Sequence, residues 1–228
     1  MSEQARPPIA RRGRSAKPPL SSRSIVDATL ALVRERGVDA LTLRQVAERV
    51  DTGPASLYAY FANRDVLLEH VLDAAYAEVR LVDTHDGERG WREALAGTIV
   101  ETITTLARYP GLGSVALGTI PVLPGALRLA EHELALMDEG GVPPGRAALG
   151  IDLIAQFAAS SAIERSVRLL GGRGDGERQQ VRSAYENADP ALFPRIRRQA
   201  ALLTAPDDRA RRDFAIRVLI DGIERTAT

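Results

Sequence analysis

The sequence predicts an all-α protein, in which a small N-terminal helical domain precedes a larger helical bundle. Apolar residues recur every three or four positions over most of the chain, which is the spacing of a helix face. No stretch shows the two-residue alternation between hairpin turns that is typical of strands. The length of 228 residues suits one small and one medium domain. We expect an arm over 1–21, a first domain over 22–70 and a second over 71–228.

Positive charge is concentrated near the N-terminus, although the chain has 30 basic and 30 acidic residues in all. Residues 1–64 contain 11 Lys or Arg and 6 Asp or Glu, so the remainder has 19 basic and 24 acidic residues. Residues 1–21 are rich in Arg and Pro and have no hydrophobic periodicity, which predicts a flexible basic arm. Nucleic acid is therefore expected to bind at this end.

Two helices are expected directly after the arm. The first begins near Ser22, with Ser24 or Ser22 as its cap, and ends at Gly37. The second is short and begins after Thr42, whose hydroxyl is suited to cap it. Its apolar residues follow the i, i+3, i+4, i+7 pattern of one helix face: Leu43, Val46, Ala47 and Val50.

A tight turn and two more helices complete this part of the sequence. Asp51 begins the turn, and Asp enters the left-handed region at lower cost than most residues. Pro54 is favoured at the first position of a helix, so the third helix is expected to begin there. Leu57 and Phe61 are on one face of it and are expected in the core. A fourth helix is expected from about Arg64.

The second domain is predicted to be a series of helices separated by Pro- and Gly-rich breaks. The segment 145–170 has apolar residues on two faces, so we expect it to be buried from two directions. The last helix, over about 207–225, has a broad apolar face. The expected breaks are at Tyr109–Gly111, Pro121–Pro124, Gly140–Pro144, Gly171–Gly176 and Asp189–Pro190.

Two short helices joined by a tight turn, after a basic arm, form the arrangement that places a recognition helix in a DNA major groove. The run Leu41-Thr42-Leu43-Arg44-Gln45-Val46-Ala47, followed by Gly53-Pro54-Ala55-Ser56-Leu57-Tyr58-Ala59-Tyr60-Phe61, resembles the signature of the TetR family of transcriptional regulators. The resemblance covers about residues 22–75. It implies a helix-turn-helix DNA-binding domain followed by a helical domain for ligand binding and dimerisation.

The resemblance implies phosphate contacts from Thr42, Tyr58, Tyr60 and Arg64, which position a protein without reading sequence. Between Thr52 and Tyr60 there is no Arg, Lys, Asn or Gln for a bidentate base contact, so direct readout is expected to be sparse. Arginines of the arm are an alternative source of contacts in a neighbouring minor groove, or the arm is only a solvated tail. The predicted DNA-binding residues are Thr42, Arg44, Thr52, Gly53, Pro54, Ala55, Ser56, Tyr58, Tyr60 and Arg64.

The second domain has the composition of a binding pocket rather than that of an active site. No nucleophile with an adjacent base and no metal-ligand spacing is found, and there is no cysteine. We therefore expect no enzyme activity, no cofactor and no metal. Neutral polar groups interrupt its apolar helices, which suits a small, uncharged, mostly apolar ligand, although such groups also bond to helix carbonyls. The predicted ligand-binding residues are Thr102, Tyr109, Gln156, Phe157, Ser160 and Ser161.

The function predicted from the sequence is a DNA-binding regulator, more specifically a repressor that a small-molecule effector releases from its operator. A homodimer on a near-palindromic double-stranded site is expected, and the resemblance implies that 145–170 and the last helix form its interface. The alternative is a helical small-molecule-binding protein without DNA-binding activity. With no signal-peptide-like core and no apolar stretch of membrane-spanning length, we expect a cytoplasmic location and no membrane partner.

Overall fold

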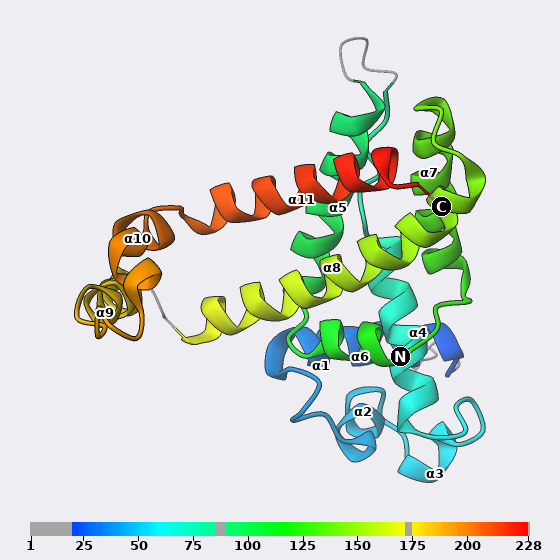
Figure 1. Ribbon diagram of the computed structural model, residues 1–228. Helices are drawn as coiled ribbons and strands as arrows, with labels where there is room; N and C mark the ends of the chain where they lie inside the picture. Colours follow the sequence, from blue (N-terminus) through cyan, green and yellow to red (C-terminus); the bar gives the residue numbers. More distant parts are fainter. Residues whose placement is uncertain (1–19, 85–89, 172–174, 228) are drawn as a thin grey trace, which may run out of the picture.

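The computed structural model describes residues 20–84, 90–171 and 175–227. These residues form helices and no strand, which confirms the all-α prediction. Figure 1 shows α1, α2 and α3 gathered at one end of the molecule, with the longer helices of the second domain beyond them. Nearly all of the expected basic arm lies outside the described residues.

The first three helices begin close to where the sequence predicts. They are α1 (Ser22–Arg36), α2 (Leu43–Arg49) and α3 (Pro54–Leu57). The cap of α1 is Ser21 and not Ser22 or Ser24: the Ser21 side chain accepts from the Ser24 amide, and the Ser24 hydroxyl accepts from the Ser21 amide. Because this capping box satisfies two donors at once, it fixes the N-cap of α1 one residue before Ser22 and three before Ser24.

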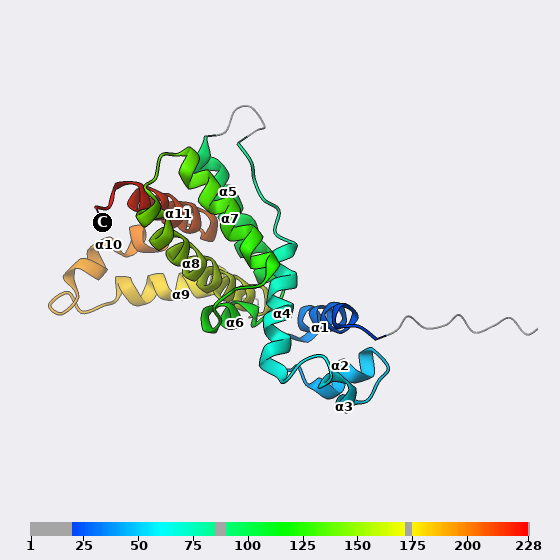
Figure 2. The same ribbon diagram turned by 90° about the vertical axis from the view of Figure 1, so that its right-hand side faces the viewer.

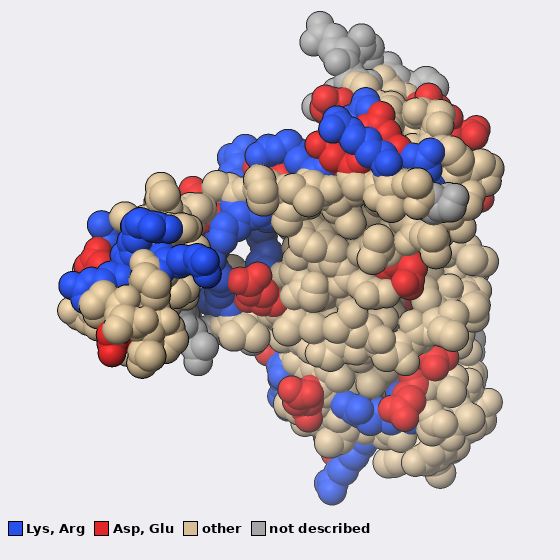
Figure 3. Space-filling model, viewed as in Figure 1, with Lys and Arg blue, Asp and Glu red and all other residues tan. Residues whose placement is uncertain are grey.

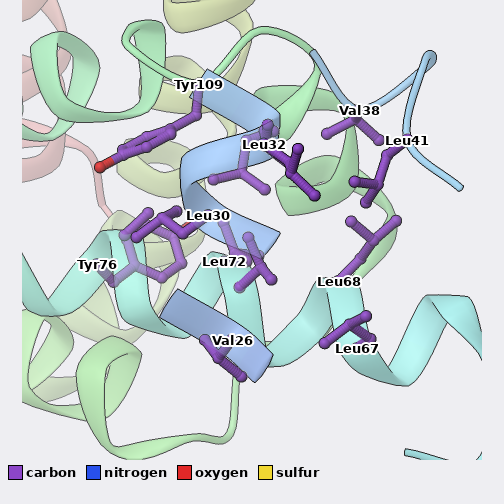
Figure 4. Packing of buried hydrophobic residues seen from close by; sticks show 14 of the residues in the cluster. Val26, Leu30, Leu32, Val38, Leu41, Leu67, Leu68, Leu72, Tyr76 and Tyr109 are labelled. Carbon is purple, nitrogen blue, oxygen red and sulfur yellow. The ribbon is translucent and has the colours of Figure 1, made fainter. Parts of the chain in front are cut away.

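Helix α4 (Arg64–Ala77) joins the small domain to the rest of the molecule, and Figure 2 shows it running from α3 up to α7. Its buried face packs on α1 in a core that also includes Leu57 and Phe61, as predicted. Figure 4 shows Leu30 and Leu32 of this core together with Leu72, and Tyr109 beside them. The core therefore includes a residue from the second domain.

Seven helices make up the second domain among the described residues. Four of the predicted breaks lie at or beside the breaks between them, and the predicted break at Gly171–Gly176 lies partly outside the described residues. A further break at 205–207, between α10 and α11, was not predicted. Helices α5, α7, α8 and α11 enclose a second core, centred on Leu95, Ile99 and Ile154. The helices are α5 (Trp91–Ala107), α6 (Leu112–Gly118), α7 (Pro124–Glu139), α8 (Pro144–Gly171), α9 (Asp175–Glu186), α10 (Pro194–Thr204) and α11 (Asp208–Arg225).

Helix α8 is buried on one face only, which differs from the expectation that it is buried from two directions. Ile154, Ala158 and Ala162 are buried, whereas Leu149 and Leu153 are 61% and 49% exposed. By length and composition alone, α8 is the one described helix apolar enough to cross a membrane. A long helix that packs on a protein core passes the same test, so this is weak evidence for a membrane segment.

Candidate nucleic-acid interface and ligand cavity

The turn between α2 and α3 has the geometry that the sequence predicts. The Thr42 hydroxyl accepts from the Gln45 amide at 3.3 Å, and Gln45 Oε1 accepts from the Thr42 amide at 2.9 Å, so the cap of α2 is a capping box. Asp51 has a φ of 53°, in the left-handed region. Gly53 is the N-cap residue of α3, and Pro54 is at its start, as expected. These local features set the angle between the two helices.

Most residues predicted to bind DNA lie on the surface of this turn. Thr52 and Arg64 are half-buried and the other eight are exposed; among these Tyr58 is 57% and Tyr60 is 39% exposed. Leu57 is buried on the opposite side of α3. Eight of the ten residues are thus accessible in and around the turn, and the contacts of all ten with DNA stay a prediction.

Besides Thr42, three of these side chains have partners within the protein. Arg64 donates from Nη2 to the carbonyl of Val38 at 2.7 Å, which fixes the start of α4 against the end of α1. The Tyr60 hydroxyl donates to the carbonyl of Leu20 at 2.9 Å. Leu20, the first described residue, therefore lies beside Tyr60 at the predicted DNA-binding surface. Arg44 forms an exposed ion pair with Glu48, which is one turn away.

Without its arm, the small domain has nearly balanced charge. Residues 20–64 contain six arginines and five acidic residues. Two of these arginines, Arg44 and Arg49, pair with glutamates. The excess positive charge noted in the sequence therefore belongs mainly to the arm.

A cavity of about 520 Å³ lies between α5, α8 and α11. Ile103 of α5 and Phe157 of α8 give it an apolar side. Five arginines of α8 and α11 line the rest, together with two carboxylates. Hydrogen bonding with Arg168 lowers the pKa of Asp208, so that carboxylate stays ionised. The full lining is Ile103, Phe157, Ser161, Glu164, Arg165, Arg168, Leu169, Asp208, Arg209, Arg211, Arg212 and Ala215.

The structure brings two of the six predicted ligand-binding residues, Phe157 and Ser161, to this cavity. Thr102 is buried and donates to the carbonyl of Thr98, and Ser160 is exposed and donates to the carbonyl of Phe157. Both make the helix-carbonyl bonds that were the alternative interpretation of such residues. Exposed Gln156 donates to Asp152, also on α8.

Tyr109 is in the first core and not in the cavity. Its hydroxyl donates to Glu78 Oε2 at 2.7 Å, and burial together with this bond raises the pKa of Tyr109 to about 12. The cavity arginines were missed because charged residues along one helix usually indicate a face exposed to solvent, and α8 and α11 were considered separately. The one sequence signal for this site is that arginines recur with the same spacing near the end of α8 and at the start of α11.

The second domain contacts the small domain at a loop as well as through α4. The amide of Val38 donates to the carbonyl of Pro110, at the break between α5 and α6, at 2.8 Å. Gly111 follows with a φ of 86° and lies so close that a Cβ there would be 2.8 Å from the Cβ of Val38. Movement of α6 would therefore reach the end of α1 directly.

Comparison with known proteins accounts for both domains. The family model for bacterial regulatory proteins of the tetR family matches residues 25–71, and that for the tetracyclin repressor-like C-terminal domain matches residues 84–227. The chain belongs to the TetR family. The TetR-type tetracycline repressor of class A from transposon 1721, of Escherichia coli, is 26% identical over 206 residues, covering 90% of this chain and 91% of the repressor.

Two Streptomyces proteins, an HTH-type transcriptional repressor and the TetR family protein ActR, are similar to the chain as well. The repressor DrrR1 of Streptomyces coeruleorubidus is 29% identical, covering 67% of this chain and 56% of DrrR1. The crystal structure of ActR from Streptomyces coelicolor in complex with actinorhodin superposes with a TM-score of 0.80 at 29% identity, covering 90% of this chain and 97% of ActR. This chain is accordingly a ligand-responsive, DNA-binding transcriptional repressor and not an enzyme.

Proposed function

We propose that the repressor acts as a homodimer on a near-palindromic operator. The argument rests on α3, which is short and has no side chain suited to bidentate base recognition between Thr52 and Tyr60. One such helix provides too few base contacts for specific affinity. Two copies related by a two-fold axis double these contacts and require a symmetric site.

The dimer interface that we propose is formed by α8 and α11. Leu149 and Leu153 of α8, and Phe214 and Val218 of α11, are each about half exposed or more in the single chain. Figure 3 shows that the face formed mainly by α8 has few charged side chains over its broad central area. Covering this face with the same face of a second copy would bury these side chains in a four-helix interface.

We propose that the cavity between α5, α8 and α11 is the effector site and that the effector has a mostly apolar body. Support comes from the apolar side of the cavity and from ActR, a similar protein that has been crystallised with actinorhodin. Phe157 and Ser161 flank Ala159, whose backbone packs against α6 at Gly113. An effector that shifts this turn of α8 would move α6, and α6 would move the loop bonded to Val38.

Regulation requires the effector to favour the arrangement that does not bind DNA. A coupling of about 10- to 100-fold, or roughly 1.4–2.8 kcal/mol, would give useful control. Operator DNA must then weaken effector binding by the same factor, because linkage between two binding sites is reciprocal. Calorimetry with and without operator measures this factor, and equal effector affinities would exclude the mechanism.

The deciding experiment for this function is selection of genomic DNA fragments by the purified protein. We expect enrichment of a near-palindromic sequence upstream of a few genes, whose products would in turn indicate the effector. No enrichment at low salt would favour the alternative, a helical small-molecule-binding protein without DNA-binding activity. The proposed place of action is the cytoplasm, where the operator is, with no membrane partner.

A further inference from the structure

The wall of the effector cavity carries more positive than negative charge. Its five arginines, on α8 and α11, have three carboxylates among their described partners. Arg168 pairs with Glu164 and Asp208, and Arg211 pairs with Asp208 at 3.1 Å. The third carboxylate, Asp213, accepts from Arg212 at 2.8 Å and lies 3.6 Å from Arg209. Three carboxylates cannot neutralise five guanidinium groups.

Arg165 is the one arginine of the five that has no hydrogen bond or ion pair with any described residue, so at least part of the surplus charge belongs to it. The neighbouring Glu164 pairs with Arg168 instead. A guanidinium group presents five N–H donors in a planar fork that matches a carboxylate or another oxyanion. Arg165 therefore offers an unused oxyanion site at the edge of a cavity whose other side, at Ile103 and Phe157, is apolar.

Figure 3 shows arginines and acidic side chains around a hollow between the α9–α10 region and the body of the molecule. A second cavity of about 470 Å³ lies between α8, α9, α10 and α11 and shares four lining residues with the first: Glu164, Arg168, Asp208 and Arg211. The charged part of the first cavity thus continues into the second, whereas Ile103 and Phe157 offer a surface for an uncharged ring or chain. Both halves of an amphipathic molecule thus have a matching surface.

We propose that the effector is an amphipathic organic anion, with its apolar body against Ile103 and Phe157 and its carboxylate or similar group bound by Arg165. This rests on the proposed effector site and specifies its ligand class. The expectation of an uncharged ligand was based only on the neutral polar residues of the second domain. The apolar side of the cavity agrees with the apolar part of that expectation. Its arginines indicate that the ligand is negatively charged rather than uncharged.

A pair of fluorescent probes tests this directly: 8-anilinonaphthalene-1-sulfonate, which is anionic, and N-phenyl-1-naphthylamine, which has the same rings without the sulfonate. Both are titrated against the full-length protein and against Arg165→Gln. We expect the variant to weaken binding of the anionic probe about fivefold to tenfold, the range of one partly exposed charge-assisted contact, and to leave the neutral probe unchanged. Arg198→Gln, an exposed arginine of α10 outside the cavity, is the matched control and should affect neither probe.

In Ser161→Trp the larger side chain would occupy the cavity. This variant tests whether the cavity is the effector site, separately from whether the effector is an anion. We expect Ser161→Trp to prevent binding of the anionic probe and of the neutral probe alike, whereas Arg165→Gln weakens only the anionic one. If Ser161→Trp blocks both probes but Arg165→Gln weakens neither selectively, the anion proposal is overturned and the effector site stands. If both probes bind Ser161→Trp as they bind the unmodified protein, the cavity is not the effector site and both proposals fail.

Discussion

Gly113 of α6 packs directly on the backbone of Ala159 in α8. A Cβ built at Gly113 would lie 2.7 Å from the carbonyl oxygen of Ala159, closer than real Cβ atoms approach other atoms. The contact joins the cavity-lining part of α8 to α6, and the loop before α6 is hydrogen-bonded to Val38 in the small domain. It therefore lies on a packed route from the cavity to the DNA-binding helices.

Gly113→Ala is expected to push α6 away from α8. Overpacking of this kind typically costs about 1–3 kcal/mol of unfolding free energy. We also expect weaker operator binding, because displacement of α6 would shift the preceding loop, whose Pro110 carbonyl accepts from the Val38 amide. Thermal unfolding and operator titration measure the two effects. Gly118→Ala, in the same helix with open space around it, is the control. If the two variants have the same stability and the same operator affinity, Gly113 does not take part in the coupling.

Arg64→Ala is expected to change both stability and the salt dependence of DNA binding. The bond from Arg64 to the Val38 carbonyl contributes about 1 kcal/mol, and the remaining donors of the guanidinium are free to reach a phosphate. Loss of that phosphate contact lowers the slope of log affinity against log salt by about one unit. Specificity should not change. Arg217→Ala, on the distant α11, controls for loss of one charge. A lower melting temperature with an unchanged slope of log affinity against log salt would show that Arg64 stabilises the fold but does not contact a phosphate.

Removal of residues 1–18 is expected to lower operator affinity several-fold. Most of the excess positive charge belongs to these residues, and the chain enters the folded domain at Leu20, beside Tyr60. Arginines in a neighbouring minor groove would favour A·T-rich flanks, so the truncated protein should also lose that preference. Titration at two salt concentrations on operators with different flanks provides the measurement. Unchanged affinity at low salt would identify the arm as a solvated leader.

Leu153→Asp is expected to convert the protein to a monomer at micromolar concentration. Leu153 is half exposed in the single chain and lies on the proposed α8 and α11 interface, where a new carboxylate would be desolvated without a partner. Sedimentation measures the state, and operator affinity should fall with it. The control is Ile120→Asp, on a loop where the side chain is 85% exposed. A dimeric Leu153→Asp protein would place the interface elsewhere.

Stability is expected to fall as the pH rises from about 5 to about 8, because of Glu133. Burial on α7 raises the pKa of its carboxyl to about 8. In the unfolded chain the same group titrates near its ordinary value of about 4.3. Between these values the folded state binds more protons than the unfolded state, so increasing pH favours unfolding.

Glu133→Gln removes this titration and should flatten the dependence of the melting temperature on pH over the same range. The amide resembles the protonated carboxyl in shape and carries no charge, so the variant should be the more stable protein at pH 8. Unfolding curves at pH 5.5, 7 and 8 for both proteins measure the difference. Parallel curves would mean that Glu133 titrates normally in the folded protein.

The sequence by itself determined where the helices of the small domain begin, whereas α3 ends at Leu57, before Phe61, which was expected on it. Thr42 with Gln45, Asp51 and Pro54 specify helix starts and a turn through bonds between near neighbours, so their effect can be read locally. The breaks in the second domain were predictable for the same reason, since Pro and Gly act on their own backbone. Ser21, missed as the cap of α1, shows the limit of such local rules where several serines compete.

Tertiary structure alone decided where the functional groups of the second domain meet. Tyr109 belongs to a core because α4 brings Glu78 to its hydroxyl, a contact between residues far apart in the chain. The arginine-lined cavity exists because the end of α8 and the start of α11 lie side by side, which places Arg165 and Arg212 around one space. Periodicity defines the faces of each helix, but the packing of helices determines which faces enclose a cavity and which remain exposed.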